Sequence, residues 1–326
     1  MNLYKKLLKH LEDNLKTMTN KNLVIGFSGG IDSTLLLYMF NSLKEKYNIN
    51  LEAIYVNHNL SENSNYWQNF CEETCENLGV KFSYSSVNLD NKNANIEQQA
   101  RLLRYNSYYT LFKNFTVVLG HHSSDLLETM MSQIIRGSDI HNVAGMKEFS
   151  HKKGQCFWRP MLNILNKDDV YHIFNYIKKN INSNISHIYD ESNDSNIYLR
   201  NLIRNDIFPH LKNIDQYYEK RLMSSVKKIQ ESVDLIDELA QIDLINCKFI
   251  KSIDFSEFNI DIAKDLSCVR FKNLIMYLYK KEYKYTPKES LIEELYKFIK
   301  TNKKNLAFFI PLNIELNNSC LKIIQR

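Results

Sequence analysis

Residues 23–40 read LVIGFSGGIDSTLLLYMF, and this stretch decides the fold that we expect for the chain. The run that ends at Phe27 is short, apolar and rich in β-branched residues, as in a buried parallel strand. Gly29 and Gly30 allow a turn with positive φ and a close approach of the backbone to a ligand. From about Asp32 onward, apolar residues recur at helical spacing. Because the free amides at a helix start favour an anion, the stretch predicts a phosphate-binding loop.

Two common nucleotide-binding loops do not fit this stretch. It lacks the lysine of the G-x-x-x-x-G-K-S/T loop, and its glycines do not match G-x-G-x-x-G. The S-G-G-x-D-S pattern resembles the pyrophosphate loop of the N-type ATP pyrophosphatases, which cleave ATP between the α and β phosphates and transfer AMP to a substrate oxygen. The alternative without function is a capped helix that follows a glycine turn.

Composition limits the class of protein further. The 326 residues, of which 44% are hydrophobic, suffice for one large and one smaller domain. No apolar run approaches the ~20 residues that span a bilayer, and residues 1–16 carry charge throughout, so we expect a cytoplasmic protein without a membrane partner. The six scattered cysteines favour reduced thiols. A net charge of +5, with its excess after residue 215, permits a nucleic-acid partner.

Strand-like and helical patterns alternate along the first two thirds of the chain. The predicted strands cover residues 23–27, 51–56, 80–87 and 116–119. Helical patterns follow them at residues 32–46, 64–78, 95–113 and 124–135. This alternation predicts an α/β fold with a doubly wound parallel sheet, whose ligands gather at the carboxyl ends of the strands. Polar segments follow the first, second and fourth predicted strands, so the expected ligand edge is also the polar one.

The remainder of the chain differs in pattern. We place a catalytic domain at residues 1–215 and a smaller, mainly helical domain at residues 216–326. The longest helical periodicity in the second domain covers residues 216–245. β-like segments follow at residues 305–316 and 319–326, so the second domain is expected to end in strands.

The segment after the fourth predicted strand, LGHHSSDLLET at 119–129, carries two histidines and two carboxylates. Asp125 and Glu128 are three residues apart and would share one face near a helix start. The cluster could bind a cationic substrate, a Mg²⁺ ion that bridges phosphates, or both. Carboxylates in a first turn also simply cap helices. A transition-metal site ranks below these interpretations, because nothing else in the chain completes one.

Two pairs of arginines lie at helical spacing. Arg101 and Arg104 are three residues apart in IEQQARLLRY, and Arg200 and Arg204 are four apart in a helical stretch that ends near Pro209. Each pair is either a solvated face or a contact for phosphate groups. The first pair follows a strand end beside the predicted nucleotide site, where it could also stabilise charge that develops on a leaving group.

An ordered series of motifs makes the resemblance more specific. The chain resembles the tRNA(Ile)-lysidine synthetases over roughly residues 22–211. The matching motifs stand in the family's order: SGGIDS at 28–33, VNH at 56–58, E-x-x-A-R at 97–101 with Arg104 and Tyr105 after it, GHHSSDLLET at 120–129, IIRGSD at 134–139, AGM at 144–146, WRPML at 158–162, and a D-x-S-N turn leading to YLRNLIR at 190–204. Each later motif is weak alone, but their order is a strong signal.

This resemblance implies a two-step reaction on an adenine nucleotide α-hydrolase-like fold. Enzymes of the family use ATP to adenylate O2 of the wobble cytidine in tRNA(Ile) with a CAU anticodon. The ε-amine of free L-lysine then displaces AMP and gives lysidine, which changes the codon specificity from AUG to AUA. The implied partners are therefore this tRNA, lysine, ATP and Mg²⁺, and the C-terminal region would help to select the tRNA. A homodimer stays open.

The resemblance also implies roles for individual residues. The ATP phosphates would be held by consecutive loop residues: Ser28, Gly29, Gly30, Ile31, Asp32 and Ser33. Among these, Asp32 is the candidate partner of Mg²⁺. The remaining roles fall on side chains from later motifs: Arg101 and His121 in catalysis, Asp125 and Glu128 in lysine binding, and Arg104, Arg200 and Arg204 in tRNA binding. The group that accepts the proton from the attacking amine stays open among His121, His122 and the carboxylates.

Two other functions compete with this hypothesis. A tRNA thiolase with the same loop would be expected to carry a cysteine pair for sulfur or an iron–sulfur cluster, whereas Cys71 and Cys75 lack C-x-x-C spacing. An RNA-binding module that only senses ATP would not need Arg101, His121 and the two carboxylates together. Turnover of ATP with and without tRNA distinguishes the module from an enzyme.

Overall fold

The chain divides into two compact units, Met1–Val226 and Lys227–Arg326. The division lies within helix α10 (Tyr218–Asn246), whereas the sequence suggested residue 215. The computed structural model describes residues 2–58, 63–86, 96–189, 199–252, 255–283, 287–301, 307–309, 314–317 and 320–324. The polar turn of the D-x-S-N motif and the side chain of Glu97 lie outside the described residues.

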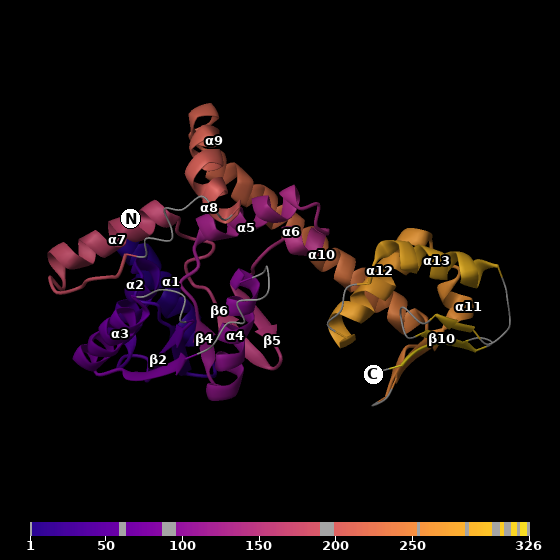
Figure 1. The fold of residues 1–326 in the computed structure, drawn as a ribbon, viewed down its shortest axis with the longest axis horizontal. Helices are drawn as coiled ribbons and strands as arrows, with labels where there is room; N and C mark the ends of the chain where they lie inside the picture. Colours follow the sequence, from indigo (N-terminus) through magenta and orange to yellow (C-terminus); the bar gives the residue numbers. More distant parts are fainter. Residues whose placement is uncertain are drawn as a thin grey trace. The chain divides into compact units, whose positions relative to one another are not determined.

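A six-stranded sheet forms the centre of the first unit, with strand order β3-β2-β1-β4-β6-β5 (Figure 1). Five strands are parallel: β1 (Asn22–Gly26), β2 (Asn50–Asn57), β3 (Lys81–Ser86), β4 (Thr116–Val118) and β6 (Gln155–Trp158). The sixth, β5 (Phe149–Lys152), is antiparallel to β6 at one edge. The four predicted strands and their parallel arrangement are confirmed. The β5–β6 hairpin was not predicted.

Helices cover both faces of this sheet. Those that pack on it are α1 (Leu3–Thr17), α2 (Ile31–Leu43), α3 (Ser64–Leu78), α4 (Ile96–Leu111) and α7 (Lys167–Asn180). The unit also contains α5 (Ser123–Ile135) and the short α6 (Ile140–Val143). Successive side chains of a strand point to opposite faces. Leu23 and Ile25 of β1 accordingly join the core formed with α1, α2, α3 and α7, whereas Val24 joins the core formed with α4. The sheet is thus doubly wound, as the sequence predicted.

A third core of the first unit surrounds α5. Leu126, Leu127 and Met130 of α5 pack with Ile203 and Phe208. These last two belong to one continuous helical stretch made of α8 (Leu199–Leu202), the π-helical turn η2 (Ile203–Ile207) and α9 (Phe208–Ile214). Extra residues in a π turn shift the side chains that follow, and such turns are frequent at functional sites.

The second unit has its own core and its own sheet. Its antiparallel strands are ordered β7-β8-β11-β10-β9: β7 (Ile250–Lys251), β8 (Phe255–Asn259), β9 (Ala307–Phe309), β10 (Ile314–Asn317) and β11 (Cys320–Ile324). Its further helical segments are α11 (Ile260–Ala263), α12 (Cys268–Leu278), η3 (Tyr279–Tyr283) and α13 (Glu289–Lys300). The unit is helical with terminal strands, as predicted, but β7 and β8 were not predicted. No helix in the described ranges combines the length and apolar character needed to cross a membrane.

Candidate active site

The loop between β1 and α2 is held in place by hydrogen bonds to the backbone carbonyl of Gly29. Gly29 has φ +77°, and its carbonyl oxygen accepts hydrogen bonds from Thr34 Oγ1 at 3.1 Å and from the Ile188 amide at 2.8 Å. A Cβ on Gly29 would lie 2.5 Å from Ile188 Cδ1 and 3.2 Å from Cys71 Sγ. Both the conformation and the space therefore require glycine at this position.

The start of α2 leaves backbone donors for a ligand. Its N-cap is Gly30, and no side chain caps the helix among the described residues. The hydroxyls of Ser28 and Ser33 lie 3.3 Å apart, and Ser33 Oγ donates to the Gly30 carbonyl at 3.0 Å. An uncapped helix start with two adjacent hydroxyls suits the phosphates of a nucleotide, because amide donors and the helix dipole both favour negative charge there.

Asp32 lies where this loop meets the end of β4. A Cβ on Gly120 would come within 3.0 Å of Asp32 Cβ, so the two segments touch. Asp32 Oδ1 is buried and, within the described part of the chain, has no hydrogen-bond partner; His122 Nε2 is 3.7 Å away. Burial, with a smaller contribution from Asp125, raises the pKa of Asp32 to about 6. A buried carboxylate oxygen without a donor fits a cation such as Mg²⁺, which often uses one carboxylate together with substrate phosphates.

The start of α5 is a capping box. His122 Nδ1 accepts from the Asp125 amide at 3.4 Å, and Asp125 Oδ2 accepts from the His122 amide at 2.9 Å. One Asp125 oxygen thus serves the helix cap, as the alternative interpretation expected. Glu128 lies one turn further on, and its side chain is 1% exposed.

Arg200 and Arg204 bind these same carboxylates. Arg200 places Nη2 2.6 Å from Asp125 Oδ1 and Nε 2.6 Å from Glu128 Oε2. Arg204 donates to Glu128 through Nε at 2.6 Å and Nη2 at 2.9 Å. Burial alone would raise the pKa of Asp125, but His122 and Arg200 hold it well below its usual range. The residues predicted for lysine binding and two of those predicted for tRNA binding therefore form one ion-pair cluster, which we call the acidic-arginine cluster.

Arg101 and His121 lie in a second group together with Arg159, a residue to which the sequence analysis assigned no role. Arg101 Nη2 donates to Tyr105 Oη at 3.2 Å, and Arg159 Nη2 donates to the same oxygen at 3.3 Å. Burial lowers the pKa of His121 to about 3, with Arg159, Arg200 and Arg101 acting in the same direction against Asp125. The His121 side chain is therefore neutral near pH 7, so it can take part in hydrogen bonds but carries no positive charge.

Arg104 does not join either group. Its Nη2 lies 3.3 Å from His58 Nε2, beyond the end of β2. Burial and the nearby guanidinium lower the pKa of His58 to about 4, so His58 is neutral. The four arginines predicted from two helical patterns thus lie in three different environments.

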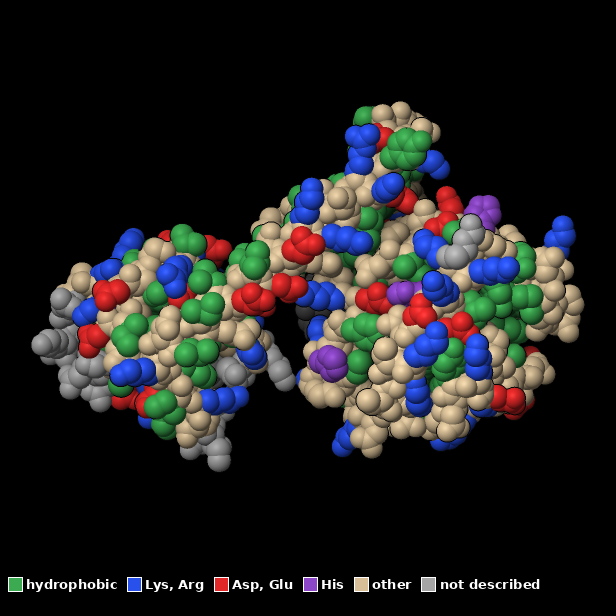
Figure 2. Space-filling view, turned by 180° about the vertical axis from the view of Figure 1, so that it is seen from behind, with side chains coloured by type: hydrophobic (Ala, Val, Ile, Leu, Met, Phe, Trp, Pro, Cys, Tyr) green, Lys and Arg blue, Asp and Glu red, His purple; other side chains and the backbone are tan. Residues whose placement is uncertain are grey.

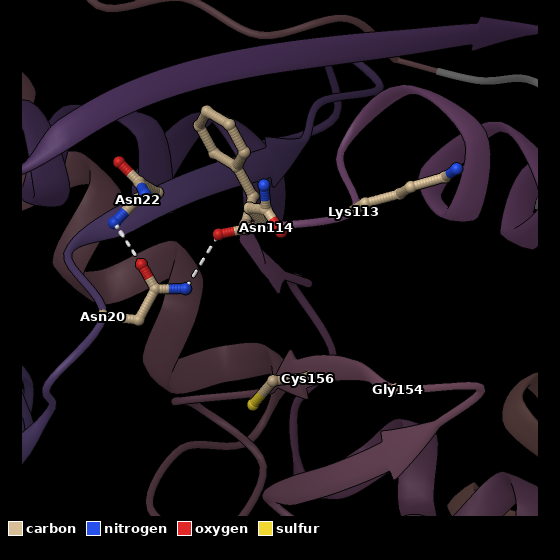
Figure 3. A pocket seen from close by; sticks show the side chains of 7 residues that line it. Asn20, Asn22, Lys113, Asn114, Gly154 and Cys156 are labelled. Atoms are coloured by element: carbon tan, nitrogen blue, oxygen red, sulfur yellow. Dashed lines mark hydrogen bonds between the residues drawn. The ribbon is translucent and has the colours of Figure 1, made fainter.

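A hollow of about 420 Å³ lies at the opposite ends of the strands (Figure 3). It is lined by Asn20, Asn22, Lys113, Asn114, Phe115, Gly154 and Cys156. The Asn20 side chain links two segments of this lining: it accepts a hydrogen bond from the Asn22 amide at 2.9 Å and donates one to the Asn114 carbonyl at 2.8 Å. Its residues flank the starts of β1, β4 and β6, whereas ligands of such sheets bind at the carboxyl ends. We assign it no part in the chemistry.

The fold and the loop define an ATP-binding α/β protein of the pyrophosphate-loop type. Residues 2–211 match the PP-loop domain family, and the chain belongs to that family. Its curated relatives include the tRNA(Ile)-lysidine synthases of Francisella. The Francisella philomiragia subsp. philomiragia protein is 32% identical over 279 residues, which cover 85% of this chain and 66% of the relative. The Francisella tularensis subsp. tularensis protein is 29% identical over 315 residues, which cover 94% and 75%.

A solved structure supports the same architecture. The U34-tRNA thiolase NcsA from Methanococcus maripaludis, with its 4Fe-4S cluster, matches with a TM-score of 0.56 at 19% identity. The match covers 70% of this chain and 79% of the thiolase chain. At this identity the likeness concerns the fold alone, and the choice of reaction rests on the sequence relatives and on the site.

Proposed function

We propose that this chain ligates free L-lysine to C2 of the wobble cytidine in tRNA(Ile) with a CAU anticodon, at the cost of ATP cleavage to AMP and pyrophosphate. The observation that carries the proposal is the meeting of two kinds of group at one edge of the sheet. A phosphate-binding helix start and Asp32 follow β1, and the buried carboxylates Asp125 and Glu128 follow β4. A nucleotide and a cationic amine can therefore be bound side by side.

ATP is held by the loop from Ser28 to Ser33. Amides at the start of α2 and the hydroxyls of Ser28 and Ser33 face its phosphates. Asp32 would hold Mg²⁺, which supplies positive charge to the phosphates as negative charge moves to the leaving group. The orphaned Oδ1 of Asp32 is the atom suited to this contact.

Adenylation is the first chemical step. The cytidine O2 attacks the α-phosphorus, the bond from that phosphorus to the bridging oxygen breaks, and pyrophosphate leaves. Arg101 stabilises the negative charge that develops on the phosphoryl oxygens. His121, which is neutral and half-buried in the same group, supplies a hydrogen bond to the base or the phosphate.

Displacement by lysine is the second step. The neutral ε-amine attacks C2 of the activated cytidine, the bond from C2 to the adenylated oxygen breaks, AMP leaves, and the proton lost from the attacking nitrogen passes to solvent. Asp125 and Glu128 bind the amino groups of lysine. Because Arg200 and Arg204 already contact both carboxylates, a lysine ammonium replaces at least one guanidinium contact when it binds. Arg200 and Arg204 are then available to tRNA phosphates.

The tRNA is selected with the help of the second unit, and the reaction takes place in the cytoplasm. Lysine and arginine side chains are spread among acidic ones over the face in Figure 2. The net charge of +5 favours a polyanion in general and carries no sequence information. Recognition of one tRNA therefore needs contacts to bases besides the contacts to phosphates.

The decisive experiment incubates the purified chain with ATP, Mg²⁺, labelled lysine and a tRNA(Ile) transcript that carries the CAU anticodon. We expect a lysine-modified cytidine at the wobble position by mass spectrometry of the digested RNA, and none without ATP. A tRNA(Met) transcript with the same anticodon is the control for selection. Cleavage of ATP to AMP without lysine in the RNA would contradict the proposal and indicate another acceptor for the same adenylating chemistry.

A further inference from the structure

We propose that Tyr105 is a positioning residue for Arg101, and that the buried Arg159 holds Tyr105 in place for this task. The proposal rests on the function given above, in which Arg101 acts in adenylation. Its basis is a single phenol oxygen, Tyr105 Oη, that accepts a hydrogen bond from each guanidinium group, at 3.2 Å from Arg101 and 3.3 Å from Arg159.

Arg101 needs such support because it lies on the exposed side of α4. A free arginine side chain loses much conformational freedom when it is fixed in one geometry. Tyr105 restrains Arg101 in two ways: its oxygen accepts from Nη2, and its ring centroid lies 5.0 Å from the Arg101 Cζ. In the described part of the chain, no carboxylate pairs with Arg101 and draws it elsewhere.

Tyr105 is itself fixed against the sheet. The residue is 8% exposed, and its ring centroid lies 5.0 Å from that of Phe157 in β6. Arg159 follows β6 directly and is 3% exposed. Its Nη1 donates to the Lys147 carbonyl at 3.1 Å and to Ser150 Oγ at 2.9 Å, so the guanidinium is anchored to the β5–β6 hairpin. A rigid chain of contacts thus runs from the sheet to an exposed arginine.

Arg159 is a costly residue to bury, which indicates that it has a task. Its Nε is buried and, among the described residues, has no hydrogen-bond acceptor, and no carboxylate there neutralises its charge. Removing a charge from water without a partner opposes folding. The two guanidinium groups favour negative charge between them and lower the pKa of Tyr105, although burial alone would raise it. Both cations also lie near His121, within the proposed adenylation site.

The competing explanation is that Tyr105 only fills an aromatic core. Its ring packs near Tyr108 and Tyr109 as well as Phe157. A core role uses the ring alone, so Tyr105→Phe would retain it, whereas positioning of Arg101 needs the oxygen. The substitution Tyr109→Phe is the matched control. Tyr109 lies one turn further along α4, packs against Phe157 with centroids 6.0 Å apart, and in the described structure forms no hydrogen bond with Arg101 or Arg159.

The test is a double-mutant cycle on Arg101 and Tyr105. We would measure single-turnover release of pyrophosphate with saturating ATP and tRNA, together with KM for ATP and KM for lysine, in the full-length chain. We expect Tyr105→Phe to slow release about tenfold, the range for loss of a hydrogen bond to a charged group. Neither KM should change by more than about twofold. Tyr109→Phe should match the wild type.

The cycle decides whether Tyr105 acts through Arg101. If it does, the double variant Arg101→Ala/Tyr105→Phe is no slower than Arg101→Ala alone, because the oxygen has nothing left to position. Effects that multiply in the double variant, or a Tyr105→Phe protein that behaves like Tyr109→Phe, would overturn the proposal. Absence of lysidine from the wild-type reaction contradicts the proposed function instead. Pyrophosphate release reports adenylation of any acceptor, so the cycle remains decisive in that case.

Discussion

Asp32 shows how a buried group can favour function and oppose stability. About a third of its side chain is exposed, at 36%, but Oδ1 is buried, so desolvation acts on that oxygen. The pKa in the folded chain, about 6, lies above the ordinary value of 3.8. The folded state therefore binds the proton more tightly than the unfolded state. Its stabilisation is complete below pH 3.8 and is lost as the pH rises through about 6.

Asp32→Asn should consequently stabilise the chain at pH 8 by about 1 kcal/mol, a value reduced for the partial exposure of the side chain. The gain should shrink between pH 6 and pH 4, as measured by urea denaturation across that range. The variant should also lose ATP cleavage, because an amide cannot replace the carboxylate as a Mg²⁺ ligand. The exposed Asp168, also in a first helical turn, provides the control Asp168→Asn. A less stable Asp32→Asn protein at pH 8 would contradict this account.

Asp125→Asn tests the lysine site. The amide oxygen can still accept from the His122 amide, so the cap of α5 survives, but the charge that attracts an ammonium is gone. We expect KM for lysine to rise about tenfold while adenylation of tRNA stays within about twofold. Asp169→Asn is the control, since Asp169 has the same place in the capping box of α7. Equal loss of adenylation and lysine use would remove Asp125 from the lysine site.

At this scale the sequence predicted residues within local motifs better than residues that meet across the fold. Ser28 to Ser33 lie in one turn, and Asp125 and Glu128 in one helical turn, so spacing alone brought them together. The contacts of Arg200 with Asp125 and Glu128 join segments more than 70 residues apart, which no local pattern reveals. Arg159 was missed because a sequence does not show which arginine is buried.

Among the elements, the loop before α2 makes the strictest demand on one residue. Gly29→Ala would strain a left-handed backbone and press a methyl group against Ile188 and Cys71. We expect a loss of about 2–3 kcal/mol in the free energy of unfolding and a higher KM for ATP. Gly79→Ala is the control, because Gly79 has φ +61° but no heavy atom within 4 Å of the added Cβ. Equal losses in both variants would show that backbone strain alone accounts for the effect.

The helical stretch from α8 to α9 decides how accessible the acidic-arginine cluster is. Arg200→Ala removes a guanidinium that competes with lysine for Asp125 and Glu128. In the absence of tRNA we therefore expect lysine to bind about three- to tenfold more tightly, as measured by calorimetric titration. Arg221→Ala, which breaks an ion pair with Asp215 at a side chain that is 75% exposed, should change nothing. Unchanged or weaker lysine binding in Arg200→Ala would mean that the two cations use different oxygens.

Long elements were predicted correctly because their apolar residues follow one period. Strands β1, β2 and β3 and helices α2 to α5 are of this kind, whereas the three-residue β4 was recognised as an uninterrupted apolar run. The β5–β6 hairpin has two strands of four residues, joined at Lys153 and Gly154, both with positive φ, and four residues show little periodicity. The π-helical turn η2 was missed for another reason. Its sequence fits an ordinary α-helix, and its packing with α5 joins segments far apart in the chain, so no local pattern reveals the turn.

At the scale of the whole molecule, each unit is stabilised by a separate set of contacts. The second unit contains a fully buried carboxylate, Asp243, which accepts hydrogen bonds from Arg270 Nε at 3.2 Å and from Arg270 Nη2. Loss of one partner from such a pair leaves a buried charge without compensation. The division near Val226 and the separate cores predict that damage to this pair stays within the second unit.

Arg270→Ala should therefore destabilise the second unit and leave the first unit unaffected. Calorimetry should show one transition at lower temperature, while the tRNA-independent affinity for ATP stays at the wild-type value. Lys272→Ala is the control on the same helix, because Lys272 pairs only with the more exposed Glu289 and Glu293 in the described structure. Loss of ATP affinity in Arg270→Ala would show that the two units do not fold independently.

The packing of Cys71 beneath Gly29 has a practical consequence. This thiol is fully buried and held in its protonated form by burial, so it reacts with an alkylating agent only when the segment above it moves away. The rate at which Cys71 is alkylated therefore reports how often the phosphate-binding loop opens. A nucleotide that holds the loop closed would lower this rate. The effect of each ligand on loop opening can therefore be measured on the chain's own thiol, without an attached probe.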